Sequence, residues 1–230
     1  GTDALLAILM AQGIEPGDAV FLPAFTFPAS AEVIVLIGAI PVFVDVQAGT
    51  CNMDPASLED KIAQVKAASQ NRPKAIIAVD LYGLPADYPA IDEIARRENL
   101  TLIADAAQSF GGTLNNRKVG ALADATAISF FPAKPLGCYG DGGAVLTDDE
   151  ELAHALRSIR AHGKGESKYD IDRIGLNARL DTIQAAVLLS KLTIFEEEIE
   201  RRELLSRVYD LHLGENVHLP GRQTGSISAW

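Results

Sequence analysis

Residues 100–109 read Leu-Thr-Leu-Ile-Ala-Asp-Ala-Ala-Gln-Ser, a short apolar run that passes directly into polar residues. A run that is nearly all apolar is typical of a parallel strand covered on both faces by helices. Open α/β sheets bind their ligands beyond the carboxyl ends of such strands, so Asp105 and Gln108 lie at a candidate site. The same stretch also fits a simpler interpretation, in which Asp105 only caps a helix.

Similar apolar runs alternate with helical patterns along the chain. The predicted strands are residues 19–22, 41–46, 75–79, 100–104, 125–131 and 143–146. The predicted helices are residues 4–12, 30–37, 55–68, 88–98 and 149–159. This alternation predicts a layered α/β domain. Past residue 163 the pattern predicts a loop and one long charged helix, residues 182–210, with Glu196–Glu198 on its solvated face.

The composition narrows the classes of function. The chain has 230 residues, 48% of them hydrophobic, and its 20 Lys and Arg against 31 Asp and Glu give a formal charge of -11. A surface of this charge repels phosphate backbones and anionic lipids, so we expect neither nucleic acid nor membrane as a partner. The longest apolar run, residues 33–44, is broken by Gly38 and Pro41 and predicts no membrane span.

Two cysteines are too few for a disulfide scaffold and favour the cytoplasm. The His and Cys residues have no metal-ligand spacing, so we expect no metal.

Lys134 follows a predicted buried strand and lies between two prolines, in Ser-Phe-Phe-Pro-Ala-Lys-Pro-Leu-Gly (129–137). Prolines restrict the backbone on both sides of this lysine. Desolvation lowers the pKa of a lysine, and the neutral amine attacks carbonyl groups, as Schiff-base enzymes require. The alternative is an ordinary surface lysine in a loop.

Two further segments favour the binding of a phosphate. Gly-Asp-Gly-Gly (140–143) is a flexible turn, and Gly-Thr-Asp-Ala-Leu (1–5) begins a helix whose first N–H groups can hold an anion. Together with Asp105 and Lys134, they provide what pyridoxal phosphate needs: a phosphate anchor, a carboxylate for the ring nitrogen and a Schiff-base lysine.

Six motifs lie in order along the chain: Gly-Thr-Asp-Ala-Leu (1–5), Pro-Ala-Phe-Thr-Phe (23–27), Asp-Ala-Ala-Gln-Ser (105–109), Ser-Phe-Phe-Pro-Ala-Lys-Pro-Leu-Gly (129–137), Gly-Asp-Gly-Gly-Ala (140–144) and Gly-Leu-Asn-Ala-Arg-Leu-Asp (175–181). In these motifs, up to about residue 191, the chain resembles the DegT/DnrJ/EryC1/StrS sugar aminotransferases. The resemblance implies a three-layer αβα fold with a central, mostly parallel sheet, the large domain of type I pyridoxal-phosphate enzymes. It implies a cofactor domain at residues 1–191, and a linking helix with the start of a small C-terminal domain at residues 192–230. Both domains are expected to be truncated, with most of the small one missing.

The resemblance also assigns roles to single residues. It implies that Lys134 forms the Schiff base with the cofactor and that Asp105 pairs with the ring nitrogen. The remaining cofactor contacts that it implies are Gln108 at the phenolate oxygen, Gly1, Thr2 and Ser129 at the phosphate, Phe27 stacked on the ring, and Asn177 reaching into the neighbouring subunit of a homodimer. Arg179 is the candidate for binding substrate anions. Ala133 departs from the Ser or Thr that many relatives have before the lysine.

The implied reaction is transfer of an amino group from glutamate to a keto nucleotide-sugar. The motifs at 129–144 and 178–199 most resemble those of the UDP-2-acetamido-2-deoxy-3-oxo-glucuronate aminotransferases, which serve the synthesis of surface polysaccharide (O-antigen, lipopolysaccharide). Three alternatives stay open: an aminotransferase for 4-keto-6-deoxy nucleotide sugars, a non-catalytic relative that binds the cofactor, and a generic nucleotide-binding domain with magnesium on Asp105.

Overall fold

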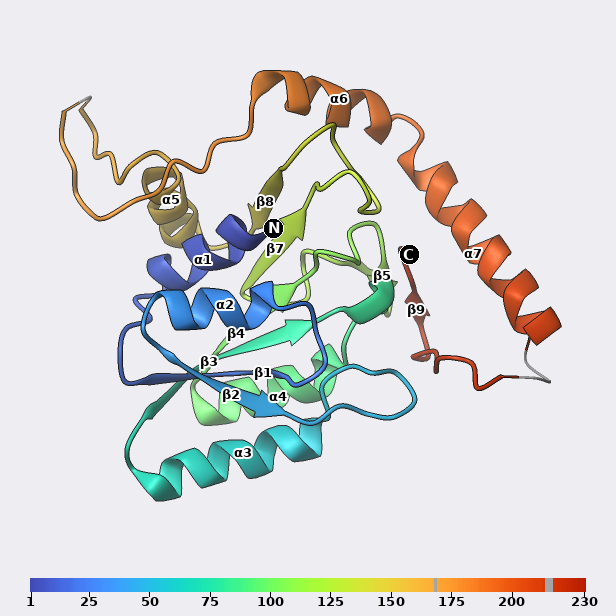
Figure 1. The fold of residues 1–230 in the computed structure, drawn as a ribbon, viewed down its shortest axis with the longest axis horizontal. Helices are drawn as coiled ribbons and strands as arrows, with labels where there is room; N and C mark the ends of the chain where they lie inside the picture. The colour runs from blue at the N-terminus through green and yellow to red at the C-terminus, as the bar shows by residue number, and fades with distance from the viewer. Residues whose placement is uncertain (168, 214–216) are drawn as a thin grey trace.

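A six-stranded sheet with the order β2-β1-β3-β4-β7-β8 forms the centre of the molecule (Figure 1). The computed structural model describes residues 1–167, 169–213 and 217–230. The six strands are β1 (Asp18–Pro23), β2 (Ile40–Val44), β3 (Arg72–Val79), β4 (Thr101–Asp105), β7 (Ala125–Ser129) and β8 (Gly143–Leu146). Neighbouring strands are parallel except β7 and β8, which are antiparallel.

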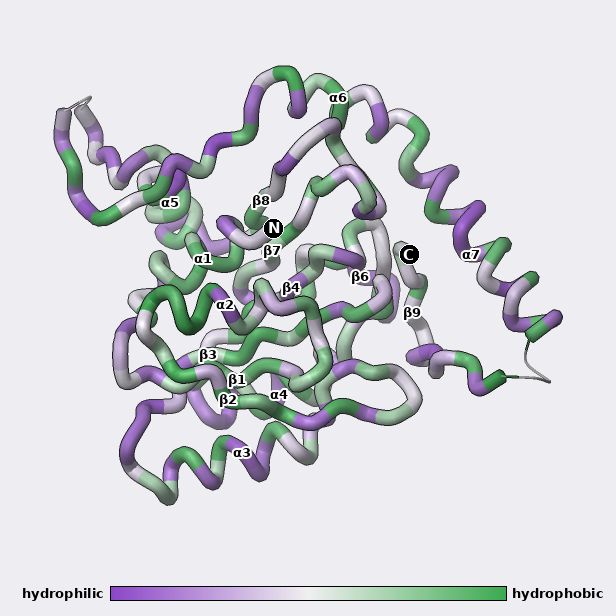
Figure 2. The backbone as a smooth tube through the Cα atoms, viewed as in Figure 1, coloured by the Kyte–Doolittle hydropathy of each residue, from purple (hydrophilic) through white to green (hydrophobic). Residues whose placement is uncertain are grey.

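Helices cover both faces of this sheet. On one face lie α1 (Thr2–Ala11), α2 (Ala29–Leu36) and α5 (Glu150–Ile159), and on the other lie α3 (Pro55–Ala68) and α4 (Tyr88–Glu98). Within β1, Val20 and Leu22 pack against the first group of helices and Phe21 packs against the second. The central strands are accordingly hydrophobic along most of their length (Figure 2). The three-layer αβα fold and the mostly parallel sheet are therefore confirmed.

Two helices have the predicted bounds because their end signals are strong. Asp54 caps α3 by accepting a hydrogen bond from the Ala56 N–H, and a proline follows the cap. Asp87 caps α4 in the same way through the Ala90 N–H. At their C-terminal ends, Ser69 and Asn99 adopt the left-handed conformation that ends a helix.

The prediction of one helix over residues 182–210 is wrong. The chain forms α6 (Thr182–Leu192) and α7 (Phe195–Leu213), separated by Thr193 and Ile194. Leu188 of α6 and Phe195 of α7 are both buried in one apolar cluster, and Thr193 donates a side-chain hydrogen bond to the Ser190 carbonyl. At the junction, residues 193 and 194 form a turn in which the Ile194 N–H donates to the Lys191 carbonyl, three residues back (3.2 Å), so the i−4 hydrogen bonds of an α-helix are interrupted here. Glu196–Glu198 are partly to largely exposed, as predicted.

Other strand predictions differ at their ends. β2 ends at Val44 rather than at residue 46, and Phe43 is half exposed because β2 is an edge strand. β7 ends at Ser129 rather than at residue 131, because the chain leaves the sheet there and turns into the loop that carries Lys134.

A second, small sheet was not predicted. It consists of β5 (Thr113–Leu114), β6 (Arg117–Lys118) and β9 (Ser226–Ile227), in the order β6-β5-β9. Next to β9, the Ala229 N–H donates to the carbonyl of Gly83, in the short helical turn η1 (Leu81–Gly83). A Cβ atom on Gly83 would lie 2.6 Å from the Trp230 nitrogen, so only glycine fits against this segment. β9 thus brings Trp230 next to the main sheet.

Within the described part of the chain, no helix combines the length and the apolar character needed to cross a lipid bilayer.

Candidate functional site

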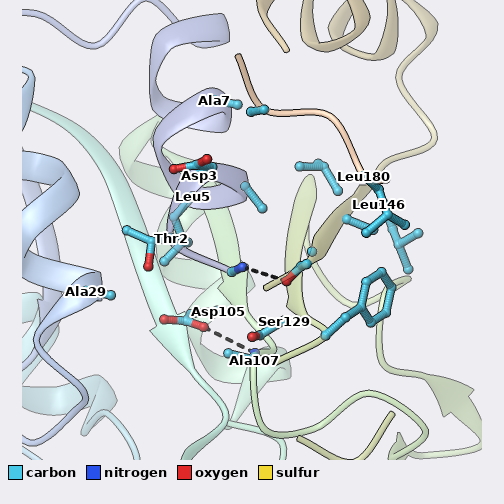
Figure 3. A pocket seen from close by; sticks show the side chains of 18 of the residues that line it. Thr2, Asp3, Leu5, Ala7, Ala29, Asp105, Ala107, Ser129, Leu146 and Leu180 are labelled. Carbon is cyan, nitrogen blue, oxygen red and sulfur yellow. Dashed lines mark hydrogen bonds between the residues drawn. The ribbon is translucent and has the colours of Figure 1, made fainter. Parts of the chain in front are cut away.

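A pocket of about 1380 Å³ opens beyond the carboxyl ends of β4 and β7, beside the start of α1. Figure 3 shows Thr2, Asp105 and Ser129, from α1, β4 and β7, around the same hollow. All of the residues predicted for the site line this pocket: Gly1, Thr2, Phe27, Asp105, Gln108, Ser129, Lys134, Asn177 and Arg179. The fold therefore brings together side chains that are up to 178 positions apart in the sequence.

Asp105 is the last residue of β4 and is buried. Its Oδ1 accepts a hydrogen bond from the Ala107 N–H (3.2 Å), drawn in Figure 3, and its Oδ2 accepts one from Ser30 Oγ (2.7 Å). Burial raises the pKa of Asp105, whereas both hydrogen bonds and the charge of Lys134 lower it. The residues after Asp105 form turns rather than a helix, so helix capping does not explain this carboxylate.

Lys134 lies in the loop between β7 and β8, where its N–H donates to the Phe131 carbonyl (2.8 Å). Its side chain is half buried, and its Nζ lies 5.0 Å from the ring centroid of Trp230. Burial lowers the pKa of Lys134, and the carboxylate of Asp105 opposes that shift. An amine in this setting loses its proton more readily than a surface lysine does.

Gly1, Thr2 and Ser129 form the end of the pocket at the start of α1. A Cβ on Gly1 would lie 2.9 Å from Ser129 Cβ, closer than side chains pack, so the backbone of α1 and Ser129 can adjoin only through a glycine. The first N–H groups of α1 have no partner within the helix, and the helix dipole favours an anion there. A hydroxyl beside them adds a donor, which fits a phosphate group.

Gln108 and Phe27 occupy the rim. Gln108 Oε1 accepts a hydrogen bond from the Tyr82 N–H (2.6 Å). Because this contact fixes the amide oxygen, the NH₂ group is the end of Gln108 that can donate to an oxygen in the pocket. The Phe27 ring is 67% exposed and offers a free face to a planar ligand.

Asn177 and Arg179 line the pocket from the segment that precedes α6. Arg179 Nη2 donates to Asn177 Oδ1 (2.7 Å), and a β-bridge between Asn177 and Ala161 fixes this segment next to α5. Both side chains are exposed. The structure places Asn177 at the pocket of its own chain, and a contact of Asn177 with a neighbouring subunit stays a prediction.

The sequence model of the DegT/DnrJ/EryC1/StrS aminotransferase family matches residues 1–226. The chain belongs to this family. A UDP-2-acetamido-2-deoxy-3-oxo-D-glucuronate aminotransferase of Pseudomonas aeruginosa is 48% identical over 100% of the chain, and a UDP-N-acetyl-3-dehydro-alpha-D-glucosamine 3-aminotransferase of Acidithiobacillus ferrooxidans is 43% identical over 98%. The chain spans 62% of the first relative and 59% of the second.

Solved structures of the family have the same fold. A crystal structure of a DegT DnrJ EryC1 StrS aminotransferase from Brucella abortus has a TM-score of 0.99 and 56% identity, and covers 100% of this chain and 62% of its own. The structure of NtdA from Bacillus subtilis with bound cofactor PMP has a TM-score of 0.87 and 31% identity, and covers 99% of this chain and 52% of its own. Family membership replaces the alternative of a generic nucleotide-binding domain. In the described residues, no group of three or more His, Cys, Asp or Glu side chains is placed to hold a metal ion.

A second buried carboxylate near the site, that of Asp80, was not predicted. Asp80 follows β3 and is fully buried. It accepts hydrogen bonds from Ser109 Oγ (2.5 Å), Tyr88 Oη (2.8 Å) and the Ala86 N–H (2.9 Å). Its own N–H donates to the Asp105 carbonyl (3.1 Å). Asp80 thus ties the turn after β3 to the segment that carries Asp105 and Gln108. Only its position at the end of an apolar run could have drawn attention to it.

The pKa of Asp80 makes the stability of the fold dependent on pH. Burial raises this pKa from 3.8 to about 7, against the opposing hydrogen bonds. The folded chain therefore holds a proton on Asp80 that the unfolded chain has lost. Between pH 4 and 7 the contribution of Asp80 to stability falls as pH rises, and above pH 7 it stays low.

Asp80→Asn replaces the protonated acid with a neutral isostere whose oxygen can still accept from the Ala86 N–H. Its NH₂ group stands in the place of Oδ2 and donates to Ser109 Oγ, as the protonated acid does, whereas the ionised carboxylate accepts from that hydroxyl. The free energy of unfolding of the wild type should fall relative to that of this variant as pH rises from 5 to 8, by at most about 3 kcal/mol. Denaturant unfolding at pH 5, 6, 7 and 8 measures this difference. The exposed Asp60→Asn on α3 is the matched control for the loss of one carboxylate. A difference that stays constant from pH 5 to 8 would contradict the raised pKa.

Proposed function

We propose that this chain forms the cofactor-binding part of a pyridoxal-phosphate-dependent aminotransferase that acts on a keto nucleotide-sugar. The observation that carries the proposal is the pairing of Lys134 with Asp105: a lysine with a lowered pKa and a buried carboxylate face one pocket and influence each other's titration. The names of the relatives and the PMP bound to the NtdA structure agree with it.

The residues of the pocket fit pyridoxal phosphate. Gly1, Thr2 and Ser129 form an anion site at one end, where a Cβ on Gly1 would collide with Ser129. Asp105 is buried and has no basic side chain hydrogen-bonded to it among the contacts described, so its charge suits a cationic ring nitrogen. When bound, the cofactor supplies an electrophilic carbonyl and a conjugated ring that withdraws electrons from the substrate carbon.

The residues of the chain then have separate tasks. Asp105 holds a proton on the ring nitrogen, because an ionised carboxylate favours the cationic form of its partner. Gln108 donates from its NH₂ group to a ring oxygen, and Phe27 covers one face of the ring. The Lys134 amine forms the covalent attachment and, once released, moves a proton to and from the substrate carbon. Arg179 binds an anionic group of the substrate.

Lys134→Ala tests the proposal. The purified wild type in its full natural length should bind pyridoxal phosphate with a visible absorption band, and Lys134→Ala should lose that band. Its aminotransferase activity should fall on the order of 10³-fold or more, because one group provides both attachment and proton transfer. Absorbance spectra and coupled activity assays measure these effects.

Lys118→Ala is the matched control, since Lys118 is an exposed lysine that pairs with Glu196, and neither residue lines the pocket. It should keep both the band and the activity. A colourless wild type that does not bind the cofactor would overturn the proposal, and a coloured wild type without turnover would favour the non-catalytic alternative.

For the substrate we propose UDP-2-acetamido-2-deoxy-3-oxo-glucuronate, with glutamate as the amino donor and a surface polysaccharide such as lipopolysaccharide as the destination. The support is that the two relatives described above are named for UDP sugars with a 3-oxo or 3-dehydro group. The alternative substrate is a 4-keto-6-deoxy nucleotide sugar.

A panel of nucleotide sugars separates these substrates. The cofactor-loaded enzyme with glutamate should turn over 3-keto UDP sugars at least about tenfold more efficiently than 4-keto-6-deoxy sugars, measured as kcat/KM, because a pocket that hydrogen-bonds one keto group leaves its donors unpaired with the other. Arg179→Lys should raise KM more than it lowers kcat for the uronate, since a lysine cannot make the bidentate contact. Exclusive turnover of the 4-keto sugars would reverse the substrate proposal.

We also propose that the enzyme is a cytoplasmic homodimer in which Asn177 serves the neighbouring active site, and that the cofactor domain ends near residue 191. Hybrid dimers test the shared site. Lys134→Ala and Asn177→Ala should each be impaired alone, whereas their mixture should regain about half of the wild-type activity in the hybrid fraction. If Asn177 acts across the interface, each hybrid dimer has one active site in which both Lys134 and Asn177 are intact. If Asn177 acts within its own chain, neither site of the hybrid is intact. Unchanged activity on mixing, with subunit exchange verified by mass, would assign Asn177 to its own chain.

A further inference from the structure

Both oxygens of Asp105 are occupied by donors from the protein. The Ala107 N–H donates a hydrogen bond to Oδ1, and Ser30 Oγ lies 2.7 Å from Oδ2. Ser30 is 75 positions away from Asp105 in the sequence, lies in the first turn of α2 and is fully buried. The orientation of the Asp105 carboxylate at the end of β4 is therefore held by a side chain of α2, a helix that covers one face of the sheet.

The direction of the hydrogen bonds follows from the number of protons. A serine hydroxyl has one proton, and an ionised carboxylate has none, so Ser30 donates to Asp105. Thr26 Oγ1 lies 3.1 Å from Ser30 Oγ, and because the Ser30 proton is already used, Thr26 must donate to Ser30. The result is a chain from Thr26 through Ser30 to Asp105 in which each donor strengthens the next.

Packing alone does not require a hydroxyl at position 30. Ser30 lies beside the apolar face of α2, where Val33 and Ile34 are fully buried. An alanine would fill nearly the same volume and has a higher helix propensity. The hydroxyl therefore serves the carboxylate rather than the helix.

Among the influences that oppose the effect of burial on the pKa of Asp105, the hydrogen bond from Ser30 is the largest, ahead of the Ala107 N–H and the charge of Lys134. The charged or titratable side chains that face Asp105 are the Lys134 amine and, behind Asp105, Asp80 and Tyr88. Ser30 is not itself a lining residue of the pocket.

We propose that Ser30, supported by Thr26, is a positioning residue that keeps Asp105 ionised and oriented toward the pocket. This inference rests on the proposed function, because an ionised Asp105 matters only if a cationic ring nitrogen is bound opposite it. Ser30 acts through Asp105 and touches neither cofactor nor substrate.

The test compares Ser30→Ala, Ser30→Thr and the control Ser158→Ala in the full natural chain with added pyridoxal phosphate. Ser158 is a buried serine of α5 whose Oγ has no hydrogen-bond partner among the residues that the structure describes, so its loss removes a hydroxyl from the same layer without touching Asp105. Two quantities are measured: the dissociation constant of pyridoxal phosphate at pH 7.5, and the midpoint of the visible absorption band against pH from 5 to 9.

Ser30→Ala should weaken cofactor binding about three- to tenfold, the range for losing one hydrogen bond to a charged group that is partly compensated. It should also move the pH midpoint of the band by about half a unit or more, because the protonation of the ring nitrogen depends on the charge of Asp105. Ser30→Thr keeps the hydroxyl and should return both values to within about twofold and about 0.2 unit of the wild type. Ser158→Ala should change neither.

Thr26→Val removes the second donor and should shift the midpoint in the same direction by a smaller amount; because Thr26 also lines the pocket, Thr26→Ser, which keeps the hydroxyl, is its control and should leave the midpoint unchanged. If Ser30→Ala does not fold, the pH midpoint of Thr26→Val tests the positioning role in its place. A midpoint unchanged in Ser30→Ala, or in Thr26→Val where the first variant is unfolded, would overturn the positioning role while the wild type still binds the cofactor. A wild type that binds no cofactor would instead remove the proposed function itself.

Discussion

The burial of one carboxylate at the end of a parallel strand is the constraint on which the site depends. Asp105 ends β4 in the middle of the sheet, where β3 and β7 flank it and helices cover both faces. An ionised group in such a place costs several kcal/mol unless hydrogen bonds and opposite charge compensate it. Ser30, the Ala107 N–H and the amine of Lys134 provide that compensation from three separate segments.

The same constraint accounts for the elements around the site. The segment after Asp105 must turn sharply to bring Gln108 to the rim, and it is held by Asp80 through Ser109 and by the Tyr82 N–H. Tyr82 adopts a left-handed backbone conformation, which costs about 1 kcal/mol or more for a side chain of its size. The hydrogen bonds of this turn offset that cost and fix the direction of the Gln108 amide.

Much of the fold could be predicted from residues next to each other in sequence. Asp54 with Pro55, and Asp87 with Pro89, mark helix starts through local hydrogen bonds, and the apolar runs mark the buried strands. The break between α6 and α7 could not be predicted, because no Gly or Pro marks it in the sequence and the spacing of the apolar Leu188 and Phe195 is that of one continuous helix face. The predicted site residues do line one pocket, since their motifs are local. Ser30 and Asp80 were missed because a single serine in an apolar helix gives no periodic signal, and their partners lie 75 and 29 positions away.

The residues that line the pocket are spread over the chain from Gly1 to Leu180, so the pocket can form only after most of the chain has folded. Contacts between such distant segments close large loops and form late. A nascent chain that has released only β1 to β4 has Asp105 but lacks Ser129 and Lys134, so it has no site to offer a ligand. A ligand of this pocket therefore binds the folded chain and not the unfolded one. By mass action, binding raises the free energy of unfolding, and it does so more strongly at higher ligand concentration.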